Sequence, residues 1–359
     1  MSPINIAYHR LHNQHITQTP FTKPSAVVDW LVAVQAQDYF GAQWALGLRL
    51  RQDAHDTDID RAFAEGSILR THVLRPTWHF VTPDDIRWLL ALTGPRVHAV
   101  NGGMYHKLEL DSATLKRSHK VLTKALQGGQ QLTRDELSKA LEKAGIALAQ
   151  GQRLAYIVMH AELDGLICSG PRRGKQFTYA LLEERVPPVR TLTRDEALTE
   201  FARRYFMSHG PATAQDFAKW SGLTLADARH GLEFVKDQLQ HEVLNGADYW
   251  FAPLSSSATW VSPTAHLLSV YDEFIIGYKD RSMIAGPEVA AQLFRMGNAL
   301  TAIVVVDGQV VGTWKRTLGK EAVIITIDYL TRMTKTQMRA VVAAAQRYGE
   351  FLQKPVVIA

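Results

Sequence analysis

Along this chain, segments whose apolar residues have helical spacing are followed by segments whose apolar residues have extended spacing, and this order recurs. Over Ser25–Val34, apolar residues recur at helical intervals, with Ser25 as the expected N-cap. Two more helices are expected, one beginning after Phe40 and one over Asp58–Ser67. Leu69–Thr82 is then rich in β-forming residues and predicts a hairpin, with Arg75 between its two arms. Helices followed by a two-stranded hairpin are the outline of a winged helix-turn-helix.

The same outline recurs further along the chain. Helices are expected over Leu132–Ala144 and Gln152–Gly165, because apolar residues return there at helical intervals. Short strands are expected over Leu166–Ser169 and Phe177–Leu181, on either side of the basic tip Gly170–Lys175. These elements predict a second wing.

A third set of elements has the same order. Thr193–Ser208 is expected to form a long helix, and Thr213–Ser221 and Thr224–Leu239 a helix pair around Gly222. Glu242–Phe251 is the candidate wing of this unit. The three sets show no tight repeat in residue identity, but they repeat an architecture.

The C-terminal part of the chain has a different pattern. Thr301–Arg316 predicts a β-hairpin around Asp307-Gly308, which is a strong turn signal. A further strand is expected over Ala322–Tyr329, a helix over Lys335–Leu352 and a closing strand over Pro355–Ala359. The predicted fold is therefore α+β, with three tandem winged helix-turn-helix units and a C-terminal β-rich domain.

The expected domain boundaries follow from this order. The units are residues 1–115, 116–190, 191–262 and 263–359. Linkers are expected at Arg185–Arg190 and Ser255–Pro263.

The composition narrows the class of protein. At roughly 100–200 residues per domain, 359 residues correspond to two or three domains. Hydrophobic residues make up 46% and charged residues 21%, which excludes a disordered chain and a membrane protein. Because Cys168 is the single cysteine and Met1–His15 lacks the apolar core of a signal peptide, we expect a cytoplasmic protein. The net charge of +5 is compatible with a polyanionic partner.

Cations gather at the predicted hairpins. The second wing carries Arg172, Arg173 and Lys175 among glycines, a pattern that fits contact with DNA phosphates, although a solvated basic turn is the alternative. Trp78 in the first hairpin is expected in the core and not as a wedge between bases. The other expected DNA contacts lie on the first hairpin and the C-terminal hairpin: Arg70, His72, Arg75, His79, Lys315 and Arg316.

Several separated segments resemble the AlkZ-like family of bacterial winged-helix DNA glycosylases. The segments are VQAQDYFGAQWALGLRL from Val34, LRPTWHFV from Leu74, GPRRGKQFTY from Gly170, RRYFMSHGPATAQDFAKWSGL from Arg203, LLSVYDEFIIGYKDR from Leu267 and VVVDGQVVGTWKR from Val304. They occur in the family's order over nearly the whole chain. The resemblance implies a C-shaped monomer that binds damaged double-stranded DNA and excises bulky or crosslinking N7-alkylated purines.

The resemblance also supplies candidate catalytic residues. The family signature is Gln, an apolar residue, then Gln or Asp, and it stands here as Gln35, Ala36 and Gln37. The Gln-x-Gln form is associated with the branch of the family that opens interstrand crosslinks. One departure is Ser269, where proline is usual; it concerns a turn and not the chemistry.

The residue types restrict the chemistry. A carboxamide cannot transfer a proton, so two glutamines can only orient water and stabilise developing charge by hydrogen bonds. Such a site suits a base that is already cationic, as an N7-alkylguanine is. Residues i and i+2 share a face only in an extended segment, so Gln35 and Gln37 are expected just beyond the end of the first helix, with Ala36 packed inward and both amides turned to a cleft. Asp38 is an alternative general base.

Other polar residues carry weaker expectations. His9, His12 and His15 recur at three-residue spacing, but no carboxylate or cysteine accompanies them, which favours a solvated or DNA-facing stretch over a metal site. Asp272 and Glu273 are expected to form a polar network in the C-terminal domain with Lys279, Asp280 and Arg281. No metal, no cofactor and no amine nucleophile are expected, so the enzyme would be monofunctional.

Two other functions remain open from the sequence. A non-enzymatic regulator would bind undamaged duplex selectively and release no base. A protein-interaction scaffold would bind DNA too weakly for its affinity to fall steeply with salt.

Overall fold

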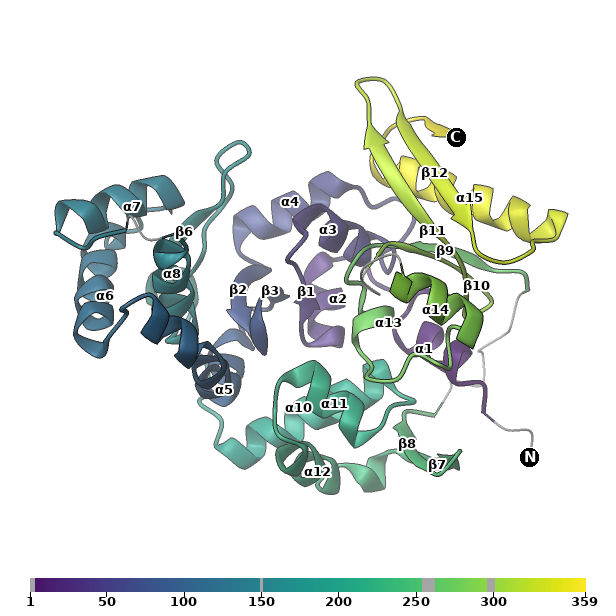
Figure 1. The fold of residues 1–359 in the computed structure, drawn as a ribbon, viewed down its shortest axis with the longest axis horizontal. Helices are drawn as coiled ribbons and strands as arrows, with labels where there is room; N and C mark the ends of the chain where they lie inside the picture. The colour runs from purple at the N-terminus through teal and green to yellow at the C-terminus, as the bar shows by residue number, and fades with distance from the viewer. Residues whose placement is uncertain (1–3, 149–150, 254–261, 296–300) are drawn as a thin grey trace.

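The N-terminal part of the protein packs short helices around a small sheet (Figure 1). The computed structural model describes residues 4–148, 151–253, 262–295 and 301–359. The N-terminal elements are α1 (Ile6–Asn13), α2 (Pro24–Leu31), β1 (Val34–Gln35), α3 (Tyr39–Gly47), α4 (Asp56–Glu65), β2 (Leu69–Val73), β3 (Arg75–Val81) and α5 (Ile86–Lys107). The predicted hairpin is confirmed, but its turn lies at Leu74, with a left-handed φ of 63°, so Arg75 belongs to β3. The sheet order is β1-β3-β2, which makes β3 central.

The long helix α5 has no counterpart among the predicted elements. Pro95 lies inside it and Gly102 and Gly103 lie in its last turns, and all three residues weaken a helical signal. One face of the first half of α5, between Ile86 and Val97, is nevertheless buried. Tertiary packing therefore stabilises a helix that local propensity does not favour.

The middle of the chain repeats helices followed by a hairpin. Its first set comprises α6 (Ser112–Leu126), β4 (Leu132–Thr133), α7 (Arg134–Lys143), α8 (Arg153–Leu163), β5 (Ile167–Ser169), β6 (Thr178–Leu181) and α9 (Leu182–Arg185). Its second set comprises α10 (Arg194–His209), α11 (Ala214–Ser221), α12 (Leu225–Glu233), a 3-10 turn (Lys236–Gln238), β7 (Gln240–Leu244) and β8 (Ala247–Phe251). Thr133 and Thr193 each accept a hydrogen bond from the backbone N–H three residues on, which confirms the predicted starts of α7 and α10.

The C-terminal part forms a five-stranded sheet with the order β13-β12-β11-β10-β9. Its elements are β9 (Ala265–Leu268), α13 (Glu273–Ile276), α14 (Pro287–Arg295), β10 (Ile303–Val306), β11 (Gln309–Leu318), β12 (Val323–Tyr329), α15 (Lys335–Phe351) and β13 (Val356–Ile358). Asp307 and Gly308, with φ of 50° and 81°, form the predicted turn between β10 and β11. The linker expected at Ser255–Pro263 lies mostly outside the described residues.

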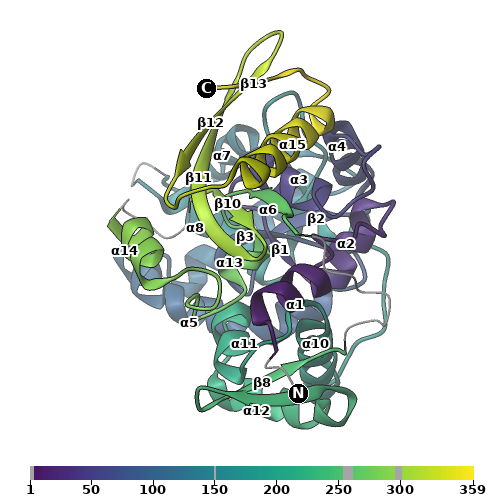
Figure 2. The same ribbon diagram turned by 90° about the vertical axis from the view of Figure 1, so that its right-hand side faces the viewer.

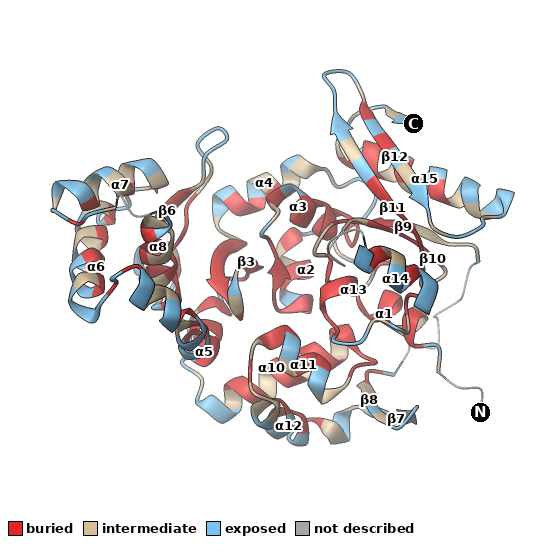
Figure 3. Cartoon of the chain, viewed as in Figure 1, coloured by how far each residue is buried: buried red, intermediate tan, exposed pale blue. Residues whose placement is uncertain are grey.

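Buried residues, red in Figure 3, lie in elements that are far apart in sequence and form shared cores. One core combines α2, α3 and α4 with the C-terminal sheet and α15. In this core the Trp44 ring meets Tyr348 edge-on at 4.9 Å, and its indole N–H donates to the Leu267 carbonyl at 2.6 Å. A second core joins the hairpin β2–β3 to α5 and to α10–α12, and a third lies within residues 108–181. The fold is a mixed α+β arrangement, and no helix among the described residues is long and apolar enough to span a membrane.

The histidine-bearing segment at the N-terminus is packed into the protein, so the expectation of a solvated or DNA-facing stretch was wrong. It forms α1, which lies between α10–α11 and the C-terminal sheet (Figure 2). The His9 ring meets Phe251 edge-on at 5.4 Å, and the His15 ring lies 5.0 Å from Trp30. Burial, reinforced by His12, lowers the pKa of both His9 and His15 to about 4.

A buried ion pair fixes the N-terminal helices to the C-terminal unit. Arg49, two residues after α3, donates to both carboxylate oxygens of Asp272 at 2.9 Å, and neither side chain is exposed. The remaining N–H groups of Arg49 donate to Gln14 and to the Ala45 carbonyl, so all five donors are used. Gln14 in turn donates to the Tyr278 hydroxyl at 2.9 Å.

Replacement of Arg49 by methionine is expected to destabilise the protein strongly. The substitution leaves the Asp272 carboxylate buried without its cation, which costs about 3–5 kcal/mol. Urea unfolding followed by circular dichroism would measure the loss. Arg61→Met is the matched control, because Arg61 pairs with Asp58 on the surface with 65% of its side chain exposed, and its loss is expected to stay below about 1 kcal/mol. Equal losses for the two variants would contradict the prediction.

Candidate active site

The glutamine motif begins just beyond the end of a helix, as predicted. Helix α2 ends at Leu31, Val32 takes a left-handed φ of 69°, and the chain then enters β1, which ends at Gln35. Ala36 is fully buried, as expected, and Gln37 lies in the bend that follows the strand. That both amides face one cleft stays a prediction.

Backbone hydrogen bonds hold this segment on both of its edges. On the side of β3, the Ala36 N–H donates to the Trp78 carbonyl at 2.7 Å. On the opposite side, the Gln35 N–H donates to the Glu273 carboxylate at 2.9 Å. The Ala36 carbonyl accepts from the Arg70 guanidinium at 2.9 Å. The position of the motif is therefore set by hydrogen bonds and does not depend on a ligand.

The two glutamine side chains have different surroundings. Gln35 is 8% exposed, and its amide oxygen accepts from the Arg75 guanidinium at 2.9 Å, which defines the orientation of the amide group. Gln37 is exposed, and its amide oxygen lies 3.4 Å from the Trp78 N–H. One glutamine is thus preorganised, while the other remains accessible to a ligand.

Glu273 is a buried carboxylate that the sequence patterns did not connect with the motif. Besides Gln35 it accepts from the Trp220 indole N–H at 2.7 Å, and the His209 ring lies 3.6 Å away. Burial lowers the pKa of His209, although Glu273 opposes the shift. The expectation of a polar network in the C-terminal domain was wrong. The partners of Glu273 come from β1 and α11, and Asp272 pairs with Arg49.

A signal for this arrangement was present in the sequence. Asp272 and Glu273 interrupt the apolar run that extends from Leu267 to Ile276. Carboxylates in such a run are expected to be buried, and buried carboxylates require partners. The pattern could therefore predict that Asp272 and Glu273 are buried and have partners, but it could not identify those partners.

Arg75 connects the glutamine motif to α11. Its guanidinium donates to the Trp220 carbonyl as well as to Gln35, and it lies 3.3 Å from the His79 ring. Burial lowers the pKa of Arg75, and the negative charge of Glu273 acts in the opposite direction. Arg75, predicted as a DNA contact, therefore also positions Gln35.

Three other predicted DNA contacts are buried: Arg70, His72 and His79. The Arg70 guanidinium lies 4.3 Å from the Trp78 ring, and burial lowers its pKa to about 10. His72 pairs with the buried Glu162, and the His79 ring contacts the Thr77 carbonyl at 3.0 Å. Arg70 also lines a cavity together with Trp78 and Lys175, so its side chain borders space that solvent can enter.

The remaining predicted DNA contacts are more accessible, and two of them approach the motif. Arg172 lies 5.5 Å and Arg316 lies 6.0 Å from the ring of Phe40, which is 49% exposed. Phe40 is three residues beyond Gln37. A cation from the loop between β5 and β6 and one from β11 therefore converge on Phe40, close to the motif in sequence.

Arg173, Lys175 and Lys315 are exposed. Arg173 pairs with Glu136 at 2.8 Å. Lys175 lines a cavity of about 370 Å³ together with Trp78, Phe177 and Tyr179. This cavity opens between the first hairpin and the second wing.

Asp38, the alternative base, lies half-buried at the N-cap position of α3 without capping its backbone. A Cβ atom at position 41 would lie only 2.9 Å from the carboxylate oxygen of Asp38. Gly41 therefore leaves room for the Asp38 side chain. Ser269, the departure from the family pattern, lies near the same glycine and is buried.

Comparisons with known proteins show the family and the fold. The family model described as DNA glycosylase AlkZ-like matches residues 28–351. An interstrand DNA cross-link repair glycosylase of Streptomyces sahachiroi is 29% identical over 320 residues, which cover 82% of this chain and 83% of that protein. The solved structure of Streptomyces sahachiroi DNA glycosylase AlkZ has the same fold, with a TM-score of 0.78, 23% identity, and coverage of 99% of this chain and 98% of that chain. The chain belongs to the AlkZ-like family of DNA glycosylases.

Proposed function

We propose that this protein is a monofunctional DNA glycosylase that hydrolyses the N-glycosidic bond of cationic alkylated purines, including N7-alkylguanines within interstrand crosslinks. The observation that carries the proposal is the Gln35-Ala36-Gln37 segment, in which Gln35 is held between β3 and Glu273, with one amide oriented and the other exposed. The relative from Streptomyces sahachiroi, named for repair of interstrand crosslinks, supports the substrate class.

The chemistry fits neutral side chains. Cleavage of an N-glycosidic bond develops positive charge on the sugar, and ordinary glycosidases assist it with two carboxyl groups. An alkylated purine that carries a positive charge leaves as a neutral base, so it needs no acid. Gln35 and Gln37 then orient the attacking water at C1′ and stabilise the developing charge through hydrogen bonds.

The surroundings of Gln35 support a role in positioning water. Arg75 holds the amide oxygen and Glu273 holds the backbone N–H, so Gln35 is ordered before any substrate binds. Preorganised hydrogen-bonding groups lower the free energy of the transition state without reorganisation. The charge of Glu273 also offsets that of Arg75, so a cationic base meets no net repulsion from this pair.

The arrangement of cations supports binding to duplex DNA. We infer that the three sets of helices and hairpins act as winged helix-turn-helix units, divided at about the boundaries expected from the sequence, in a C-shaped monomer that acts in the cytoplasm. Arg172, Arg173 and Lys175 from the second wing and Lys315 and Arg316 from β11 would contact phosphates on either side of the motif. Base extrusion is not required for a lesion that links both strands.

The double variant Gln35→Ala plus Gln37→Ala is expected to lose base release. Removal of one hydrogen-bonding group that stabilises a transition state costs about 100-fold in rate, so the loss should be at least that large. The assay is release of N7-methylguanine, and unhooking of a crosslinked duplex, under single-turnover conditions. Gln130→Ala, on the exposed turn after α6, is the control with the same chemical change. Equal release by the double variant and by Gln130→Ala would overturn the assignment.

Base release is expected to be independent of pH between about 6 and 9, because amide groups do not titrate in this range. Asp38→Asn is expected to keep the rate within a few-fold of the wild-type rate. A large loss in Asp38→Asn would instead identify Asp38 as the general base. Both measurements use the same single-turnover assay with N7-methylguanine.

Alanine variants of Arg173, Lys175 and Lys315 are expected to weaken binding to any duplex sequence. Each lost phosphate contact should make the slope of log K against log salt concentration shallower by about 0.9. Salt titrations followed by fluorescence anisotropy measure this slope. Lys120→Ala, on the exposed face of α6, is the control. Sequence-selective binding without any abasic product would favour a regulator.

A further inference from the structure

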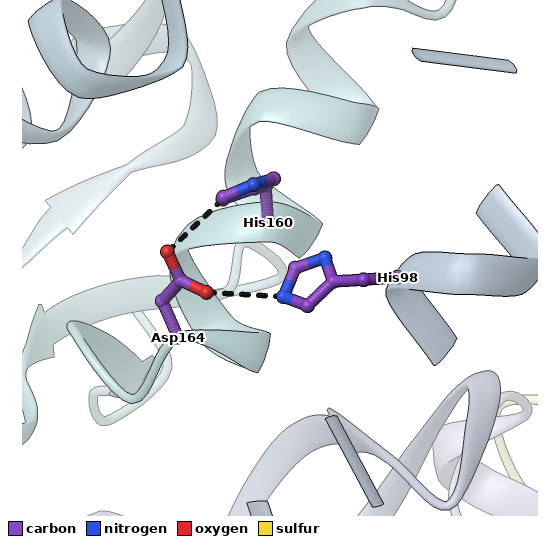
Figure 4. Close-up of side chains that lie close together, drawn as sticks. All are labelled: His98, His160 and Asp164. Carbon is purple, nitrogen blue, oxygen red and sulfur yellow. Dashed lines mark hydrogen bonds and ion pairs between the residues drawn. The ribbon is translucent and has the colours of Figure 1, made fainter. Parts of the chain in front are cut away.

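A cluster of histidines and one aspartate lies outside the proposed active site (Figure 4). His98 is on α5, His119 on α6 and His160 on α8, and Asp164 follows the end of α8. The His98 Nε2 atom lies 3.0 Å from Asp164 Oδ1, and the His160 Nδ1 atom lies 3.3 Å from Asp164 Oδ2. The His119 Nε2 atom lies 3.2 Å from His160 Nδ1.

These separations suit a metal ion. One ligand atom each from His98, His160 and Asp164 lies within 4.8 Å of the other two. Zinc binds imidazole nitrogen and carboxylate oxygen at about 2.0–2.2 Å, which places neighbouring atoms of a tetrahedron about 3.3 Å apart. The three side chains can therefore converge on one ion with small rotations.

The second nitrogen of His98 has a partner that would orient the ring. Its Nδ1 atom lies 2.9 Å from the Tyr105 hydroxyl. If Nδ1–H donates to Tyr105, the lone pair of Nε2 points to the position of the ion. Metal-binding histidines are commonly held in this way through their second nitrogen.

The cluster can also be reached from solvent. His98 and Asp164 line a cavity of about 360 Å³ together with Arg87, Gly94 and Leu182. The Asp164 side chain is 41% exposed, whereas the three rings are 16–23% exposed. This leaves a path for an ion and room for a water ligand.

We propose that His98, His160 and Asp164, with His119 beside them, bind a divalent transition-metal ion of the zinc class. The site ties α5, which packs on the first hairpin, to α6 and α8 of the next set of elements. Its role is structural: the bound ion would fix the orientation of the second wing relative to the glutamine motif. This proposal differs from the expectation of no metal, and it does not depend on the chemistry proposed for Gln35 and Gln37.

Binding of the metal ion alone tests the proposal. Tag-free full-length protein, stripped with a chelator and dialysed, is titrated with Zn²⁺ by calorimetry and with Co²⁺ by visible absorption. We expect one equivalent to bind, with the absorption of a tetrahedral Co²⁺ site and a rise in melting temperature on addition of Zn²⁺. Failure to bind one equivalent, or binding without any rise in melting temperature, would overturn the proposal.

Variants then locate the site. His160→Ala and Asp164→Asn should each lower the affinity for Zn²⁺ about 100-fold or more, and Tyr105→Phe about 10-fold. His106→Ala, an exposed histidine on the same helix α5, should bind as the wild type does. If His160→Ala does not fold, the exposed Asp164→Asn variant still decides the question. Wild-type affinity in Asp164→Asn, or an equal loss in His106→Ala, would show binding elsewhere and overturn the proposal.

Discussion

The buried carboxylate of Glu273 is the group on which the geometry of the glutamine motif depends. An unpaired carboxylate in a dry interior costs several kcal/mol, so each hydrogen-bond donor that it meets becomes a strong constraint. Its donors are the Gln35 backbone N–H and the Trp220 indole, which come from two other parts of the chain. The neighbouring Asp272 carboxylate is likewise buried, and it forms an ion pair with Arg49. Two adjacent acids therefore fix three sets of elements around one extended segment.

This arrangement separates the protein's charges from its proposed chemistry. The two glutamines are neutral, and the ions closest to Gln35 are the coupled pair Arg75 and Glu273. The guanidinium groups of Arg172 and Arg316 lie beside the neighbouring Phe40 ring, and Lys175 and Lys315 are exposed. These cations can attract a phosphate backbone from a distance, while Glu273 offsets the charge of Arg75 next to Gln35.

Much of the secondary structure could be predicted because it depends on local interactions. The capping threonines of α7 and α10 and the Asp307-Gly308 turn act within a few residues of their own positions. Helix α5 escaped prediction because packing, and not propensity, stabilises it around Pro95. The burial of Arg70 and His72 could not be predicted for a related reason. The sequence of a hairpin does not show whether a basic residue reaches DNA or is buried, as His72 is against Glu162.

The sequence by itself determined the family resemblance, the order of helices and hairpins, and the position of the Gln35-Ala36-Gln37 segment just beyond α2. Only the tertiary structure decided which groups hold that segment, because Glu273 lies 238 residues from Gln35 and no local pattern encodes such a contact. The same holds for the cluster of His98, His119, His160 and Asp164, whose members lie on three helices and the turn that follows α8. Local structure produces a periodic pattern of apolar residues in the sequence. Contacts between distant segments produce no such pattern, because they are formed when packing brings a buried charge next to a group that can pair with it.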